Sequence, residues 1–161
     1  MIQNKKSQTP VDVQPNSKFM IGIAVAPYYS SITNSLLGVA KKTLIAHGVA
    51  AHNIIVENAP GAFELPLLAS MLYQKHKLHA VICIGCVIKG ETNHDEYINH
   101  AIASSLAQLS IQWQSPFVFG VLTVNNMKQA KARSGNNDAN KGREAALAAL
   151  GMLQIKAKLT L

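Results

Sequence analysis

The sequence has few aromatic residues, few cysteines and no apolar run long enough to span a membrane. Two cysteines among 161 residues cannot form a disulfide framework, and the N-terminal residues lack the apolar stretch of a secretory signal. These features argue against a disulfide-rich secreted protein and against a membrane-spanning protein. We therefore expect a cytoplasmic protein that does not contact membranes.

Charged residues are also scarce, at 14% of the chain, and the net charge is +7. A basic balance suits anionic partners, either small phosphates or nucleic acid. The lysines and arginines are scattered and are not interleaved with aromatic residues, so we expect no nucleic acid partner. The six histidines stand at no spacing to cysteines or carboxylates that is typical of a metal site, so we expect no metal.

The chain is rich in hydrophobic residues, which make up 48% of it. That content and length predict one well-buried domain over residues 18–161. Residues 1–17 are polar, contain two prolines and are predicted to form a flexible arm. The helical segments are rich in alanine and weakly charged, which indicates that some helix faces contact other subunits.

Short apolar runs alternate with helical patterns along this domain. Strands are predicted over 19–26, 53–58, 81–84 and 117–124, each followed by a helix, with a further helix over 141–156. Ser30 or Ser31 can cap the first helix, and Gly48 ends it. Such alternation is typical of a parallel sheet with right-handed crossovers. The expected fold class is α/β: a flavodoxin-like, doubly wound three-layer α/β/α sandwich around a central four-stranded parallel sheet.

The most informative stretch is 85–97, where a buried strand crosses into a helix through polar residues. Ligands of open α/β sheets bind at such carboxyl ends of strands. Thr92 or Asn93 can cap the helix, and the positive end of the helix dipole favours a neutral imidazole at His94. A neutral histidine can act as a general acid–base. The simpler interpretation of His94 is a surface or capping residue.

Two other motifs in this region are rejected. Residues 85–92 approach the P-loop pattern, but Glu91 replaces the lysine and would repel nucleotide phosphates. Cys83 and Cys86 have the spacing of a redox pair, but they belong to a strand and three residues apart they point to opposite faces. We interpret them as buried thiols. Glu64, in the turn 59–66, either compensates a helix dipole or recognises N–H groups of a ligand.

Three motifs at three successive strand ends are more specific together than any one alone. They are 60–66, 85–97 and a third that begins at 119–123 and continues through Gln129-Ala130, 133–135 and 140–146. In order and spacing these motifs resemble the 6,7-dimethyl-8-ribityllumazine synthase family, from about Lys18 to the C-terminus. The resemblance implies a transferase that makes the penultimate compound of riboflavin biosynthesis. That family condenses 5-amino-6-(D-ribitylamino)uracil with 3,4-dihydroxy-2-butanone 4-phosphate, releases phosphate and water, and uses no metal or organic cofactor.

The resemblance also implies roles for single residues. His94 matches the proton-transfer histidine. The positions that match contacts to the pyrimidine and its ribityl chain are Tyr28, Ala62, Phe63, Glu64, Cys86, Val87, Ile88 and Phe119, of which Phe119 is expected from the neighbouring subunit. The positions that match contacts to the phosphate substrate are Glu91, Thr92, Arg133 and Lys141. Without the motifs, Phe63 and Phe119 would be interpreted as core or interface aromatics and Arg133 as a solvated residue.

Some positions depart from the common pattern of the family, notably Pro27, Tyr28-Tyr29 and Asp95. The family forms pentamers with active sites between subunits, some of which stack into decamers or shells, so a homo-oligomer is expected. The N-terminal arm can add a strand to a neighbouring sheet, and an association with riboflavin synthase fits the resemblance. Two other hypotheses stay open: a lumazine- or flavin-binding scaffold without catalysis, and a flavodoxin-like FMN protein.

Overall fold

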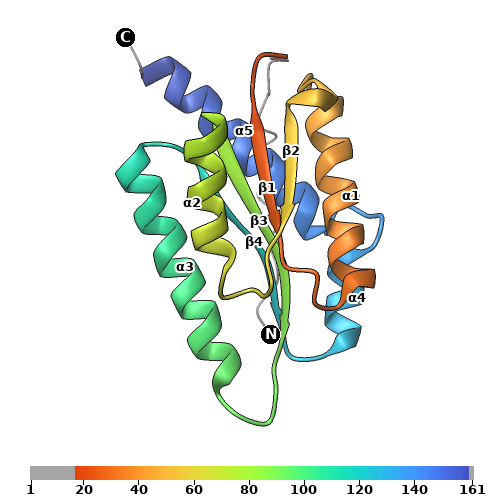
Figure 1. Ribbon diagram of the computed structural model, residues 1–161. Coiled ribbons are helices and arrows are strands. Elements are labelled where there is room, and N and C mark those ends of the chain that lie inside the picture. The colour runs from red at the N-terminus through yellow and green to blue at the C-terminus, as the bar shows by residue number, and fades with distance from the viewer. Residues whose placement is uncertain (1–16, 160–161) are drawn as a thin grey trace.

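The computed structural model describes residues 17–159, which form a four-stranded sheet between two layers of helices (Figure 1). The strands are β1 (Ile21–Val25), β2 (Ile54–Asn58), β3 (Ala80–Ile88) and β4 (Phe117–Val124). They lie in the order β2-β1-β3-β4, and every neighbouring pair is parallel. The predicted α/β class, the doubly wound layout and the number of strands are confirmed.

The helices divide between the two faces of the sheet (Figure 1). One face carries α1 (Ser30–Ala46), α4 (Met127–Ser134) and α5 (Lys141–Leu159), and the other carries α2 (Leu65–His76) and α3 (His94–Trp113). A short 3-10 turn, Ala51–Asn53, precedes β2. No helix of residues 17–159 is long and apolar enough to cross a membrane.

Alternating side chains of the strands build the two halves of the core. Ile23 and Ile82 pack with α1 and α5, whereas Ala24 and Val81 pack with α2 and α3. Side chains of a strand alternate between the two faces of the sheet. Because β1 and β3 lie in the middle of the sheet, both of their faces are buried, as expected of parallel strands. The same alternation puts Cys86 on the α1–α5 side and Cys83 on the α2–α3 side, so the prediction that they point to opposite faces is confirmed.

The structure corrects the predicted elements in two ways. The third strand runs to Ile88 rather than ending at Ile84, because β4 continues beside it and pairs Cys86 with Leu122 and Ile88 with Val124. The predicted caps of two helices are also wrong. Tyr29, not Ser30 or Ser31, precedes α1 in a left-handed conformation, and the side chain of Asn93 makes no capping hydrogen bond to α3.

Helices α1 and α5 approach each other closely at a glycine. A Cβ atom placed on Gly142 would lie 2.1 Å from the carbonyl oxygen of Leu36, so only glycine fits there without a shift of backbone. This contact fixes the start of α5 against the middle of α1. The predicted N-terminal arm lies outside the described residues except for Ser17.

Candidate active site

Because all four strands are parallel, their carboxyl ends meet at one edge of the sheet. The segments that leave this edge are 26–29 after β1, 59–64 after β2, 89–93 after β3 and 125–126 after β4. Three of the four carry residues predicted for the site. The edge therefore brings together Tyr28 and parts of the motifs 60–66 and 85–97, which lie far apart in the sequence.

The segment after β1 presents an aromatic ring to solvent. Tyr28 is 70% exposed, and its ring meets that of Tyr29 edge-on, with centroids 4.8 Å apart and planes at 81°. The strand that precedes it lies between β2 and β3, so Tyr28 leaves from the middle of the sheet where the order of strands reverses. Crevices at this point are the usual ligand sites of the fold.

The segment after β2 places Phe63 and Glu64 at the start of α2. Phe63 is 61% exposed, while Ala62 is half-buried against the core beneath α2 and α3. Glu64 is exposed, precedes α2 directly and uses its side chain for no cap. One of its carboxylate oxygens lies over Gly61, 2.9 Å from where a Cβ of that residue would be. Phe63 and Glu64, which are adjacent in the chain, thus expose an aromatic ring and a carboxylate to solvent.

The end of β3 passes from a buried strand to an exposed loop. Cys86 is buried, Val87 and Ile88 are half-buried, and Glu91, Thr92 and His94 are exposed. Burial raises the pKa of the Cys86 thiol to about 11 and that of Cys83 well above its ordinary value. Both thiols therefore stay protonated near neutral pH, as the interpretation of them as buried thiols requires. His94 is the first residue of α3, so it stands directly at the strand-to-helix crossing.

The two predicted phosphate-binding cations both contact the carboxylate of Glu144. Arg133, in the last turn of α4, lies 3.6 Å from Glu144, and the Nζ of Lys141 lies 2.6 Å from the same carboxylate. Lys141 and Glu144 are three residues apart on the first turn of α5, where side chains at this spacing are neighbours. Glu144 thus holds both cations together at the junction of α4 and α5.

A buried asparagine fixes this junction. The Nδ2 of Asn140 donates to the carbonyls of Ser134 and Gly135, at 2.9 and 2.8 Å, and its Oδ1 accepts from the N–H of Gly142 at 2.8 Å. The hydroxyl of Ser35 on α1 also donates to the carbonyl of Ser134. The end of α4, the start of α5 and the first half of α1 are therefore tied together around Asn140.

Glu144 and Asn140 were not predicted as site residues. Both stand in the motif 140–146 that supported the family resemblance. The spacing of Lys141 and Glu144 on a predicted helix was a usable signal for the ion pair. An asparagine directly before a predicted helix was likewise a signal for a cap.

Phe119 lies away from the edge that gathers the other residues. It is the third residue of β4, pairs with Cys83 and is half-buried against the core beneath α2 and α3. Val124, the last residue of β4, lies five residues on, which is about 17 Å at the rise of a strand. One chain does not place Phe119 beside Tyr28 or His94.

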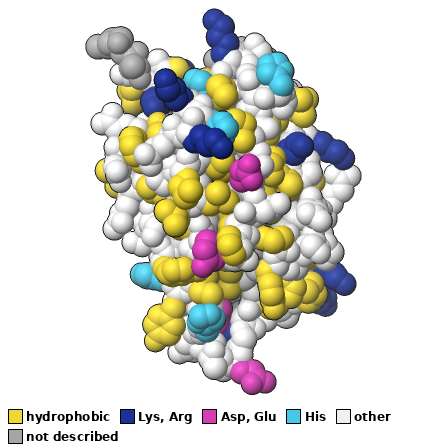
Figure 2. Space-filling view, viewed as in Figure 1, with side chains coloured by type: hydrophobic (Ala, Val, Ile, Leu, Met, Phe, Trp, Pro, Cys, Tyr) yellow, Lys and Arg dark blue, Asp and Glu magenta, His cyan; other side chains and the backbone are white. Residues whose placement is uncertain are grey.

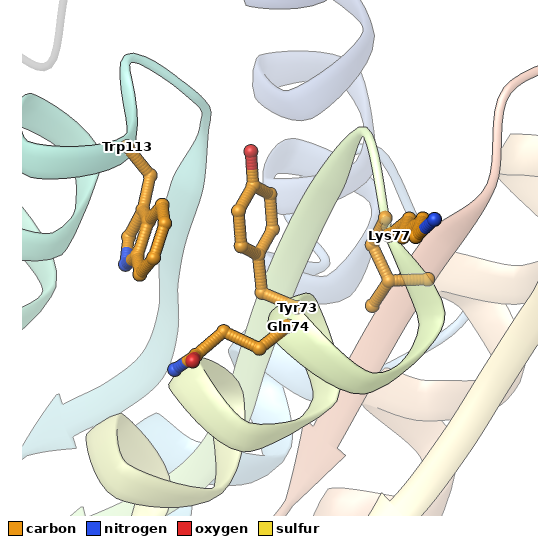
Figure 3. A pocket seen from close by; sticks show the side chains of 5 residues that line it. Tyr73, Gln74, Lys77 and Trp113 are labelled. Atoms are coloured by element: carbon orange, nitrogen blue, oxygen red, sulfur yellow. The ribbon is translucent and has the colours of Figure 1, made fainter.

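Two surface depressions of the chain lie elsewhere. One is lined by Tyr73, Gln74, Lys77, Leu78 and Trp113, at the ends of α2 and α3 near the amino ends of the strands (Figure 3). The rings of Tyr73 and Trp113 are in contact there, with centroids 5.5 Å apart. The other lies along α3 and is lined by residues from Glu96 to Ser104. Neither contains a residue predicted for the site.

Comparison with known proteins identifies the family. The family model described as 6,7-dimethyl-8-ribityllumazine synthase matches residues 18–157, which include all four strands and all five helices but the last residues of α5. The chain belongs to this family. A lumazine synthase of Porphyromonas gingivalis is 46% identical over 132 residues, covering 82% of each chain.

Two further relatives carry the same name. The 6,7-dimethyl-8-ribityllumazine synthase of Cytophaga hutchinsonii is 44% identical over 86% of this chain and 88% of its own. That of Parabacteroides distasonis is 40% identical over 88% of each chain. These similarities confirm the resemblance derived from the motifs, and they favour a lumazine synthase over a flavodoxin-like FMN protein.

Proposed function

We propose that this chain is a transferase of riboflavin biosynthesis that condenses 5-amino-6-(D-ribitylamino)uracil with 3,4-dihydroxy-2-butanone 4-phosphate to 6,7-dimethyl-8-ribityllumazine. Membership of the lumazine synthase family carries the proposal. The gathering of Tyr28, Phe63, Glu64 and His94 at one edge of the sheet supports it. Together they supply an aromatic ring that can stack on the pyrimidine, a carboxylate that can accept hydrogen bonds from its N–H groups, and an imidazole where β3 passes into α3.

Each half of the reaction needs a group that this site offers. Formation of the imine and elimination of phosphate require proton transfer, which we assign to His94. The departing phosphate requires positive charge, which we assign to Arg133 and Lys141 with the loop at Glu91 and Thr92. The ends of β2 and β3, through Ala62 and residues Cys86, Val87 and Ile88, would orient the pyrimidine by their backbone groups. Holding two substrates in register supplies the rest of the rate.

The site is proposed to be completed by a second copy of the chain. Phe119 is distant from the edge that holds His94. The cations Arg133 and Lys141 lie at the α4–α5 junction, in the helix layer opposite α3. A neighbouring subunit can bring its own Phe119, Arg133 and Lys141 to the edge formed by this one. The location of the two depressions away from the predicted residues agrees with a site that one chain does not enclose.

The outer faces of α2 and α3 suit an interface between copies. No charged residue occurs from Leu65 through Gln74 or from Ala101 through Trp113. Large apolar side chains exposed on these helices are Leu67, Met71, Tyr97 and Ile111, each more than half exposed. In the view of Figure 2, hydrophobic side chains are spread over the middle and lower part of the molecule. Exposed apolar surface of this kind marks contact with a partner.

We accordingly propose a homo-oligomer built from pentamers, with active sites between subunits. An association with riboflavin synthase and a location in the cytoplasm remain predictions of the family resemblance. The two free cysteines of the described chain are compatible with a reducing compartment.

The proposal is tested by assaying the purified protein with both substrates while following lumazine absorbance and released phosphate. We expect the two products to appear in equal amounts and well above the spontaneous reaction. The variant His94→Ala should lower kcat about a hundredfold or more while it leaves assembly intact, since general acid–base catalysis contributes about 10²–10⁴-fold. His100→Ala, six residues further along the same helix and also exposed, is the matched control.

A binding scaffold without catalysis is the second candidate. It would bind the lumazine tightly and form none above the spontaneous rate, in protein shown by light scattering to be assembled. If the wild type and His94→Ala were both fully active at equal rates, the synthase proposal would stand, but His94 would not be the proton-transfer residue.

A further inference from the structure

Tyr28 is held between two fixed backbone positions. Before it, the N–H of Ala26 donates to the carbonyl of Ile84 at 2.9 Å, and the ring of Pro27 fixes its own φ angle. After it, the carbonyl of Tyr29 accepts hydrogen bonds from the N–H groups of Ile32 and Thr33, at 2.8 and 3.1 Å. The exposed ring of Tyr28 therefore projects from a stiff turn.

The backbone of Tyr29 is in a conformation that costs free energy. Its φ and ψ are 56° and 57°, in the left-handed region, where an L-residue with a Cβ is strained and asparagine or glycine is tolerated. Strain of this kind persists where the surrounding structure imposes it, and it is found most often at functional sites. A tyrosine at this position thus requires a reason.

The position of Tyr29 in its helix does not supply that reason. In residues 17–159 the other non-glycine residues with positive φ are Lys77 and Gln114, and both follow the last turn of a helix. A left-handed residue is the ordinary way to end a helix. Tyr29 instead precedes α1, where the capping residue is normally extended and bonds through its side chain, and Tyr29 makes no such bond.

What Tyr29 does contribute is its ring. The edge of one tyrosine ring meets the face of the other at a centroid distance of 4.8 Å and an angle of 81°, the arrangement that aromatic pairs prefer. Tyr29 is 36% exposed, against 70% for Tyr28. The less exposed ring supports the more exposed one.

We propose that Tyr29 is a positioning residue for the pyrimidine substrate: its left-handed backbone and its ring hold the Tyr28 ring ready to stack on the heterocycle. The inference rests on the proposed function, which places ribitylaminouracil against Tyr28. A ring already ordered in the free protein spares the substrate the entropy of ordering it on binding. The strain at Tyr29 is thus kept because it orders a ligand contact.

The test replaces the ring but keeps the backbone. Asparagine tolerates the left-handed conformation, so Tyr29→Asn should fold and assemble while Tyr28 loses its support. We expect the dissociation constant of ribitylaminouracil, measured by calorimetry, and its KM to rise about two- to tenfold, the effect of losing one aromatic pair. The KM of the butanone phosphate should not change. Tyr29→Phe keeps the ring and should bind like the wild type.

Lys77→Asn is the matched control, because it places the same residue in the same backbone conformation at the far end of the sheet. It should leave both KM values unchanged. An unchanged dissociation constant for ribitylaminouracil in Tyr29→Asn overturns the inference, and so does an equal rise in both KM values, which would indicate a general structural role. So does binding by Tyr29→Phe as weak as by Tyr29→Asn.

The binding measurement separates this inference from the proposed function. A wild type that binds ribitylaminouracil but forms no lumazine would end the synthase proposal and still allow Tyr29 to be judged by calorimetry. A wild type that does not bind the pyrimidine overturns both.

Discussion

At the scale of the residue, the ion pair of Arg133 in the predicted phosphate-binding group can be compared with a neighbouring ion pair of the same length. Arg133 lies 3.6 Å from Glu144 and Arg143 lies 3.6 Å from Asp138, and both arginine side chains are 49% exposed. Exposed pairs of this kind contribute little to stability. Any difference between them must therefore come from what they bind.

This comparison gives a prediction with an internal control. Arg133→Ala should raise the KM of the butanone phosphate about ten- to a hundredfold, because a hydrogen bond to a charged group contributes about 1.5–3 kcal/mol. Arg143→Ala should leave that KM unchanged. Steady-state kinetics with each substrate varied in turn measures both. Equal effects of the two substitutions would show that Arg133 acts only through the surface charge.

The buried thiols give a prediction about pH. Burial raises the pKa of Cys86 from an ordinary value of 9.0 to about 11, so the folded protein keeps this proton when the unfolded chain has lost it. The free energy of unfolding should therefore fall as pH rises through this window, by up to about 1.4 kcal/mol per pH unit for each such thiol. Cys83, also raised by burial, adds in the same direction.

Denaturant unfolding at a series of pH values, at one protein concentration, measures this slope. Cys86→Ala should be less stable than the wild type near neutral pH and should lose less stability above pH 9. A slope identical to that of the wild type would mean that Cys86 does not carry the effect.

At the scale of the element, the close approach of α1 and α5 distinguishes two glycines. Gly142 has the Leu36 carbonyl 2.1 Å from a Cβ position, whereas Gly38 on α1 has nothing within 4 Å. Gly142→Ala should destabilise the fold by about 1–3 kcal/mol, since the two helices must separate. Gly38→Ala should stabilise it by up to about 1 kcal/mol through helix propensity.

Thermal unfolding at fixed protein concentration measures both glycine variants, at about 2–4 °C per kcal/mol for a chain of this size. A Gly142→Ala protein as stable as the wild type would contradict the close contact. Asn140 ties Gly142 to the end of α4. We therefore also expect Gly142→Ala to disturb the contacts of Arg133 and Lys141 with Glu144 more than Gly38→Ala does.

The elements show which parts of the structure can be predicted from sequence. The β-branched runs of β1, β2 and β4 are bounded by polar or turn residues, and their positions were predicted within two residues. β3 was predicted too short because Gly85 resembles a strand end, whereas pairing with β4 decides its true end. Pairing between distant strands has no local signal in the sequence.

The candidate site divides in the same way. The motifs located the residues of the carboxyl edge, because parallel strands bring their ends together. The left-handed Tyr29 could not be predicted, since neither a glycine nor an asparagine marks that turn. The contact of Arg133 with Glu144 depends on how α4 meets α5, which only the packed structure shows.

At the scale of the whole molecule, the exposed apolar side chains of α2 and α3 carry the prediction about assembly. Leu67→Glu should prevent or weaken association and lower activity with it, because burying an unpaired carboxylate is costly. Leu67 is 66% exposed in the single chain, so the subunit itself should still fold. Met152, on α5, is 50% exposed, so Met152→Glu is the control and should assemble like the wild type.

Mass by light scattering, read beside activity, decides this case. An active Leu67→Glu protein of unchanged mass would exclude the α2 face from the interface. A folded, inactive monomer would support a site shared between subunits, because His94 and Arg133 would both be intact in it.

The order of the helices along the chain has a consequence for biosynthesis. All four strands and the helices α2 and α3 are made before α5, yet α5 covers the face of the sheet that carries Ile23, Ile82 and Leu122. A nascent chain on the ribosome therefore exposes the part of this apolar face that α1 and α4 do not cover until the last helix emerges, and such surfaces are prone to aggregate. The cations Arg133 and Lys141 come together only at that moment, so the predicted phosphate-binding group forms only as translation of the domain ends.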